Sequence, residues 1–150
     1  MIYYRNDVRR SGVDGRALVS TARRLLGALG EGNSALSLLL VDDESIRTLN
    51  QQYRGKDNAT DVLSFPLEET RSGDREHLLG DVVISVDTAR RQADDYDAPL
   101  QRELYRLLIH GLLHLTGHDH ERTGERRAME REERRLAEAI ALPWPYAKSR

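Results

Sequence analysis

The fold is decided by the stretch Asp81–Gly117, DVVISVDTARRQADDYDAPLQRELYRLLIHGLLHLTG. This stretch joins a strand to a long amphipathic helix. Its first six residues, DVVISV, form the clearest strand pattern in the chain. Asp87 is predicted to cap a helix over residues 88–94, and Pro99 stands near the start of a second helix, which Gly117 ends. The apolar face of that second helix consists of leucines at helical spacing, namely Leu100, Leu104, Leu107, Leu108, Leu112 and Leu115.

The rest of the chain supplies strands and helices before this stretch and one helix after it. Before it we expect a short edge strand at 2–4, a helix between 12 and 30 and a buried strand at 35–41. A helix capped by Asp42 or Asp43 then runs through 53, and a strand at 60–67 ends near Pro66. Residues 68–76 are expected to form a polar loop, and a last helix runs from about 124 to 141. This order predicts an α+β fold in which helices pack on one small sheet. Residues 1–150 are expected to form a single domain.

Composition excludes several classes of protein. The chain has no cysteine, so disulfides, thiolate metal sites and cysteine nucleophiles are ruled out. It shows neither an export signal nor a membrane-spanning apolar run, so the expected location is the cytoplasm. The net charge of −2 argues against coating nucleic acid by bulk electrostatics alone. Residues 1–30 nevertheless carry six arginines against Asp7 and Asp14, so an acidic partner could dock there.

Four of the five histidines fall within the segment His110–His120, HGLLHLTGHDH. His110 and His114 are four residues apart, so on a helix both rings lie on one face, at the spacing of a two-histidine zinc site. His118 would continue the stripe, but eight residues at 1.5 Å rise place it about 12 Å along the axis from His110. That distance is too long for both rings to reach one ion. His118 is therefore a poor ligand.

Gly117 offers a route to a third ligand. A glycine in the left-handed conformation can end the helix and fold the chain back, so that His120 faces the ion held by His110 and His114. Three neutral imidazoles leave a fourth position open, which is typical of a catalytic metal site. We therefore predict one zinc ion on these three histidines. A hydrogen-bonded histidine turn without metal is the alternative.

The spacing H-x-x-x-H-x-x-G-x-x-H is similar to the zinc-binding helix of metzincin proteases, with one difference. Those proteases have a glutamate directly after the first histidine, which serves as the general base. Gly111 occupies that position here. Peptide hydrolysis by that mechanism is therefore disfavoured, and the predicted metal site must serve other chemistry.

Three blocks of sequence resemble the YbeY family of single-strand-specific endoribonucleases. The segment His110–His120 matches the family signature H-G-x-L-H-L-x-G-x-D-H, and Gly80–Ser85 (GDVVIS) matches a second block. The third block is LNQQYRGKD at 49–57 followed by TDVLSFP at 60–66. Order and spacing agree over roughly residues 35–140, with Ala59 standing where the family often has proline.

The resemblance implies a zincin-like α+β fold with a zinc ion on His110, His114 and His120, and it makes Arg54 the functional arginine. It also implies a metal-dependent endoribonuclease that acts in ribosomal RNA maturation, especially at the 3′ end of the small-subunit RNA, and in ribosome quality control. The implied partners are single-stranded ribosomal RNA, the small ribosomal subunit and ribosome-assembly proteins.

These residues suggest a mechanism. The ion would activate water, while Arg54 would clamp the phosphate and offset the charge that develops in the transition state. Lys56 is a candidate second phosphate contact, and Asp119 is expected to orient a ligand histidine or to act as a base. His118 is expected at the rim of the cleft. With one Phe and one Trp, the chain is not expected to form a stacking platform, so RNA would be held by its backbone, with the N-terminal arginines as candidates.

Three alternatives remain open at this point. The chain could be a metal hydrolase of small molecules or peptides, which a narrow, non-basic pocket would favour. It could instead be a non-catalytic ribosome-assembly factor whose metal locks His120 and the following helix in place. Finally, nickel or iron could replace zinc, because three imidazoles discriminate weakly among late first-row metals.

Overall fold

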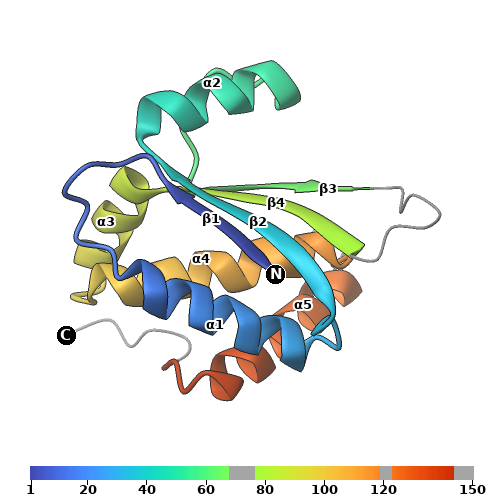
Figure 1. The fold of residues 1–150 in the computed structure, drawn as a ribbon. Coiled ribbons are helices and arrows are strands. Elements are labelled where there is room, and N and C mark those ends of the chain that lie inside the picture. The colour runs from blue at the N-terminus through green and yellow to red at the C-terminus, as the bar shows by residue number, and fades with distance from the viewer. Residues whose placement is uncertain (68–76, 119–122, 144–150) are drawn as a thin grey trace.

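The computed structural model describes residues 1–67, 77–118 and 123–143, and its centre is a mixed four-stranded sheet (Figure 1). The strands β1 (Ile2–Asn6), β2 (Ser34–Val41), β3 (Val62–Pro66) and β4 (His77–Ser85) lie in the order β1-β2-β4-β3. The pairs β1–β2 and β2–β4 are parallel, whereas β3 runs antiparallel to β4. The predicted α+β class with a small mixed sheet is confirmed.

Five helices surround the sheet in the described part of the chain. They are α1 (Gly15–Ala28), α2 (Asp43–Arg54), α3 (Val86–Asp95), α4 (Leu100–Leu115) and α5 (Thr123–Ala139). Helix α2 lies alone over one face of the sheet, while α1, α4 and α5 lie over the other (Figure 1). The predicted edge strand at 2–4, the buried strand at 35–41 and the helices of residues 12–30, 42–53, 99–115 and 124–141 are confirmed within a few residues. The predicted loop at 68–76 lies outside the described residues.

Alternation along the strands builds a core on each face of the sheet. On β4, Val82 and Ile84 belong to the large cluster under α1 and α4, whereas Val83 belongs to a small cluster with Ile46 of α2. Complete burial of such an aliphatic side chain contributes about 1.5–3 kcal/mol. The large cluster therefore fixes α4 against the sheet, and the small cluster fixes α2 on the other face.

Two predicted boundaries were wrong. Strand β4 begins at His77 and not at residue 81, because a bulge opposite Ala35–Ser37 of β2 interrupts the regular pattern. Gly80 has a φ of +146° there, and a Cβ at this position would overlap the carbonyl oxygen of Phe65. The alternation that identifies a strand is lost at such a bulge, so the sequence pattern begins only after it.

The predicted cap of the helix at 88–94 was also wrong. The N-cap of α3 is Ser85, whose hydroxyl oxygen accepts a hydrogen bond of 3.2 Å from the backbone N–H of Thr88. Asp87 lies in the first turn instead, and its carboxylate accepts a 2.9 Å bond from the backbone N–H of Asp43. The predicted cap therefore joins two helix N-termini rather than opening its own helix.

Asp43 connects α2 to α3 at these N-termini. Its Oδ1 accepts hydrogen bonds of 2.6 Å from the hydroxyls of Ser85 and Thr88, and its Oδ2 accepts a 2.7 Å bond from Arg91. Partial burial would raise the pKa of this carboxyl, but the bonds from Ser85, Thr88 and Arg91 together hold it below its ordinary value of 3.8. The network fixes the start of α2, the helix that ends at Arg54.

Within the described residues, no helix is both long and apolar enough to cross a membrane.

Candidate active site between β3 and α4

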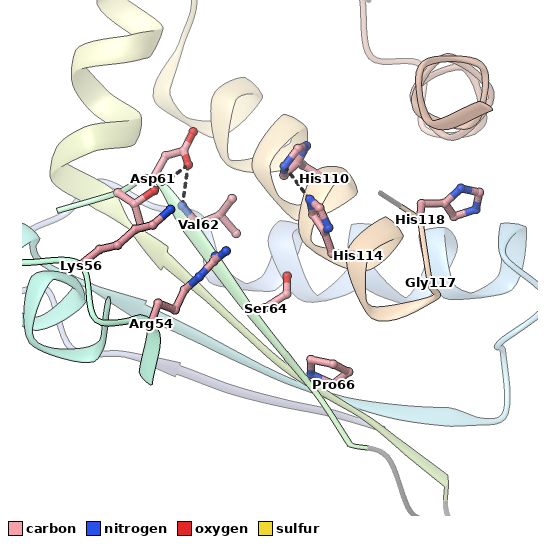
Figure 2. A pocket seen from close by; sticks show the side chains of 11 residues that line it. Arg54, Lys56, Asp61, Val62, Ser64, Pro66, His110, His114, Gly117 and His118 are labelled. Carbon is pink, nitrogen blue, oxygen red and sulfur yellow. Dashed lines mark hydrogen bonds between the residues drawn. The ribbon is translucent and has the colours of Figure 1, made fainter. Parts of the chain in front are cut away.

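A cavity of about 660 Å³ opens between β3 and the C-terminal half of α4 (Figure 2). Three segments line it: the end of α2 with the loop that follows, strand β3, and the end of α4. The lining residues are Arg54, Lys56, Thr60, Asp61, Val62, Ser64, Pro66, His110, His114, Gly117 and His118. The cavity therefore brings Arg54 together with His110 and His114, which lie far from it in the sequence. Their predicted companion His120 lies outside the described residues, as does Asp119.

His110 and His114 converge on one point of the cavity. One turn of α4 separates them, and their Nε2 atoms are 3.1 Å apart, with ring centroids 4.6 Å apart and planes inclined by 70°. Two ligand nitrogens about 2.0–2.1 Å from a single tetrahedral ion lie about 3.3 Å apart. The observed separation fits two ligands of one such ion. It also suits a hydrogen bond in which one neutral ring donates its Nε2 proton to the other.

The described residues contain no group of three histidine, cysteine or acidic side chains that could hold a metal ion. The predicted three-histidine site thus has two of its members in the described part of the chain. The donor set itself suits zinc, because both members are imidazoles that present Nε2 to the same space.

Gly111 explains how α4 comes so close to the sheet. A Cβ at this position would lie 2.9 Å from Cγ1 of Val82 and 3.2 Å from the hydroxyl oxygen of Ser64. The absence of a side chain allows Ser64 to donate a 3.0 Å hydrogen bond to the carbonyl oxygen of Gly111. A glutamate at this position would begin with an overlap against a fully buried valine. The close approach of helix and sheet therefore excludes a metzincin-type base here.

Gly117 ends α4 as the sequence predicts. It adopts a φ of +95°, and the backbone N–H of His118 turns back to donate a 2.9 Å bond to the carbonyl oxygen of Leu113. The ring of His118 points away from His110 and His114 (Figure 2). His118 thus lies at the rim of the cavity, where the sequence placed it.

Arg54 enters the cavity from the last residue of α2. Gly55, with a φ of +69°, caps the helix in the left-handed conformation, and the chain then turns toward β3. The side chain of Asn50 is 3% exposed and donates a 2.9 Å bond to the carbonyl oxygen of Asn58, which anchors this turn. Figure 2 shows the Arg54 guanidinium pointing into the space between β3 and α4. The backbone that carries Arg54 is held by the end of α2 and by this anchored loop.

Three polar residues that the sequence did not single out as site residues also line the cavity, namely Thr60, Asp61 and Ser64. The Asp61 carboxylate accepts a 2.8 Å bond from the backbone N–H of Val62, and Ser64 bonds to α4 as described. The even spacing of Val62, Ser64 and Pro66 puts these three on one face of a strand, and the resemblance block at 60–66 contains both Asp61 and Ser64. Whether this face of the strand lies toward the histidines depends on how β3 pairs with β4.

The N-terminal arginines do not line this cavity. They lie on and after β1, at the edge of the sheet opposite β3. Any contact that they make with the RNA backbone must therefore lie outside this cavity.

Comparison with known proteins identifies the family. The sequence profile described as endoribonuclease YbeY matches residues 5–141. The chain belongs to the endoribonuclease YbeY family. It is 52% identical over 127 residues to an Anaeromyxobacter protein named endoribonuclease YbeY, which covers 85% of this chain and 65% of that protein. Proteins of the same name from Aquifex aeolicus and Rhodopseudomonas palustris are 52% and 41% identical, over 69% and 89% of this chain and 68% and 81% of theirs.

A solved structure agrees with the YbeY fold seen here. The solution structure of TM1509 from Thermotoga maritima superposes with a TM-score of 0.59 at 26% identity, covering 94% of this chain and 92% of the other. The chain spans about two-thirds of the length of several YbeY relatives, including 65% of the Anaeromyxobacter protein. The family model and the solved structure thus agree on family and fold.

Proposed function

We propose that this YbeY-family chain is a metal-dependent endoribonuclease that cleaves single-stranded ribosomal RNA. The observation that carries the proposal is the shared cavity, in which the guanidinium of Arg54 faces the converging pair His110 and His114. A guanidinium can grip a phosphate through two parallel hydrogen bonds. An active site that places an arginine opposite two metal-binding imidazoles is suited to the hydrolysis of a phosphodiester.

His110, His114 and His120 would hold the metal, with zinc as the expected ion and nickel or iron as alternatives. When bound, the ion supplies Lewis-acid chemistry and lowers the pKa of a water molecule. The 3.1 Å separation of the two described Nε2 atoms supports this assignment.

The chain's own residues would then bind and orient the RNA. Arg54 would hold the non-bridging oxygens of the scissile phosphate and offset the charge that develops on them. Lys56, on the same loop, would contact a neighbouring phosphate. The described lining of the cavity contains no Phe, Tyr or Trp, which favours a grip on the backbone over base stacking.

The proposed biological role follows the family. The substrate would be the 3′ end of the small-subunit ribosomal RNA, with a further role in ribosome quality control. The partners would be the small subunit and assembly proteins, in the cytoplasm. A cavity with Arg54 and Lys56 at its wall favours a polyanion over the small-molecule or peptide substrates considered above.

Chelation and reconstitution would test the proposal. Purified protein is stripped of metal, divided, and reloaded with zinc, nickel or iron(II). Each sample is given the same RNA sequence in single-stranded and duplex form. We expect cleavage of the single strand only, lost on stripping and restored by the reloaded metal. A fully loaded, folded protein that leaves the single strand intact would favour the assembly-factor alternative.

A further inference from the structure

The charge of α1 differs from that of every other helix. It carries Arg16, Arg23 and Arg24 and no acidic residue, for a net charge of +3. Helix α5 balances five arginines with five glutamates over Thr123–Ala139. Helix α2 balances Asp43 and Glu44 with Arg47 and Arg54. Positive charge is therefore concentrated on α1, which packs against β1, the edge strand farthest from β3.

Two of these arginines have no partner in the described chain. Arg24 donates a 2.8 Å bond to the carbonyl oxygen of Ala139, whereas neither Arg16 nor Arg23 forms a hydrogen bond or ion pair within the described residues. Both side chains are exposed. The nearby acids are engaged, because Asp14 caps α1 through the backbone N–H of Ala17 and Asp7 pairs with Arg5. Two guanidinium groups thus remain available for a ligand.

Arg16 and Arg23 flank a hollow of about 550 Å³ between α1 and the edge strand β1. Its remaining lining residues are Tyr4, Gly15 and Val19. The ring of Tyr4 forms one wall of the hollow because Gly15 has no side chain. A Cβ on Gly15 would lie 2.8 Å from Cε2 of Tyr4. Burial raises the pKa of the Tyr4 hydroxyl, so it stays protonated and can donate a hydrogen bond. We call this the α1 hollow.

The spacing of the two arginines suits an extended anion. Seven residues at 1.5 Å rise separate them by about 10.5 Å along one face of α1. A nucleic-acid strand with a rise of 3.4 Å per nucleotide covers that distance in about three nucleotides. The hollow therefore presents two phosphate-binding groups on α1, with the hydroxyl of Tyr4 beside Gly15 at the N-terminal end of the helix.

We propose that the α1 hollow is a second RNA-binding site, which holds the phosphate backbone of a segment remote from the scissile bond. This inference rests on the proposed endoribonuclease function, because an endoribonuclease must bind RNA and RNA is a polyanion. The two sites lie at opposite edges of a four-stranded sheet, about 14 Å wide at the usual strand spacing. A strand of about five nucleotides spans about 14 Å at 3.4 Å per nucleotide, so an RNA that fills the catalytic cavity has to be longer than this to reach the α1 hollow as well.

The test compares the double variant Arg16→Ala/Arg23→Ala with Arg127→Ala/Arg134→Ala. The control pair has the same spacing of seven on the exposed side of α5 and, like the first pair, no partner in the described chain. Binding of RNAs of about 5 and about 40 nucleotides is measured over a series of salt concentrations without added metal. Binding is read directly, so the result does not depend on cleavage.

We expect the α1 variant to lose about tenfold in affinity for the long RNA near physiological salt, and its salt slope to fall by about 1.4, or 0.7 for each lost phosphate contact. Affinity for the short RNA should change less than about twofold, and the control should resemble wild type with both. Equal behaviour of the two variants on long RNA would overturn the proposal, as expected if an acidic protein occupies the hollow. Equal losses on short and long RNA would also overturn it. Failure of metal-loaded wild type to cleave the single strand in the reconstitution experiment would count against the proposed function instead.

Discussion

The hydroxyl of Ser64 donates a 3.0 Å hydrogen bond to the carbonyl oxygen of Gly111. This bond joins β3, the strand that follows the Arg54 loop, to the turn of α4 between His110 and His114. Two segments that carry the candidate chemistry are thereby held against each other at the floor of the cavity. Gly111 makes the contact possible, because only a residue without a side chain lets the helix approach so closely.

Replacing Gly111 with alanine should therefore destabilise the protein. The new Cβ would lie 2.9 Å from a β-branched valine that is fully buried, so the helix must move. Overpacking of this kind costs about 1–3 kcal/mol. The free energy of unfolding in urea measures the loss. Gly27→Ala is the matched control, since Gly27 lies in α1 with open space around it, and the change there should be neutral or stabilising by up to about 1 kcal/mol. Equal effects at both positions would contradict the packing argument.

Stability should depend on pH through Asp43. Its pKa is lowered on folding, so its contribution is fully present above the unfolded pKa and is lost as pH falls through the folded pKa. Asp43→Asn should cost about 1–3 kcal/mol at pH 7, because three donors lose a charged acceptor. The difference from wild type should shrink in strong acid, where Asp43 is protonated in both states. Urea titrations at several pH values check this.

Asp57→Asn is the control for Asp43, because Asp57 forms an exposed ion pair with Arg47 and anchors no second helix. Its effect at pH 7 should be much smaller. If the difference in unfolding free energy between wild type and Asp43→Asn stays constant from pH 7 into strong acid, the charge of Asp43 is not its cause.

The histidines of the HGLLHLTGH segment should separate by role. His110→Ala removes one of the two converging Nε2 atoms and should weaken zinc binding by more than about 100-fold. His118→Ala should retain zinc, because that ring points away from the pair. Metal content after dialysis measures both. Loss of zinc from His118→Ala in a folded protein would mean that His118 is a ligand.

Much of the site could be predicted from the sequence because it depends on local geometry. Four-residue spacing puts His110 and His114 on one helical face, and Gly117 ends that helix in any context that allows a positive φ. The order of helix and strand patterns along the chain was enough to predict the α+β fold class. A short, nearly continuous apolar run likewise located the buried strand β2 within one residue.

The remaining features depend on tertiary contacts that no local pattern encodes. The cap of α3 falls on Ser85 because β4 ends there, and the sequence offers Asp87 as an equally good capping residue. The bulge at Gly80 hides the first residues of β4. The inclusion of Asp61 and Ser64 in the cavity follows from the strand order β1-β2-β4-β3, which sets β3 beside α4. The same order separates the N-terminal arginines from the cavity.

The central claim is that Arg54 acts on RNA phosphate beside a histidine-held metal. The most direct measurement determines metal content and cleavage of single-stranded ribosomal RNA on the same preparations of wild type, Arg54→Ala and His114→Ala. We predict that wild type carries about one metal per chain and cleaves. Arg54→Ala should keep the metal and lose at least about 100-fold in rate, and His114→Ala should lose both metal and activity. If wild type binds metal but all three folded proteins leave the RNA equally intact, the account is wrong.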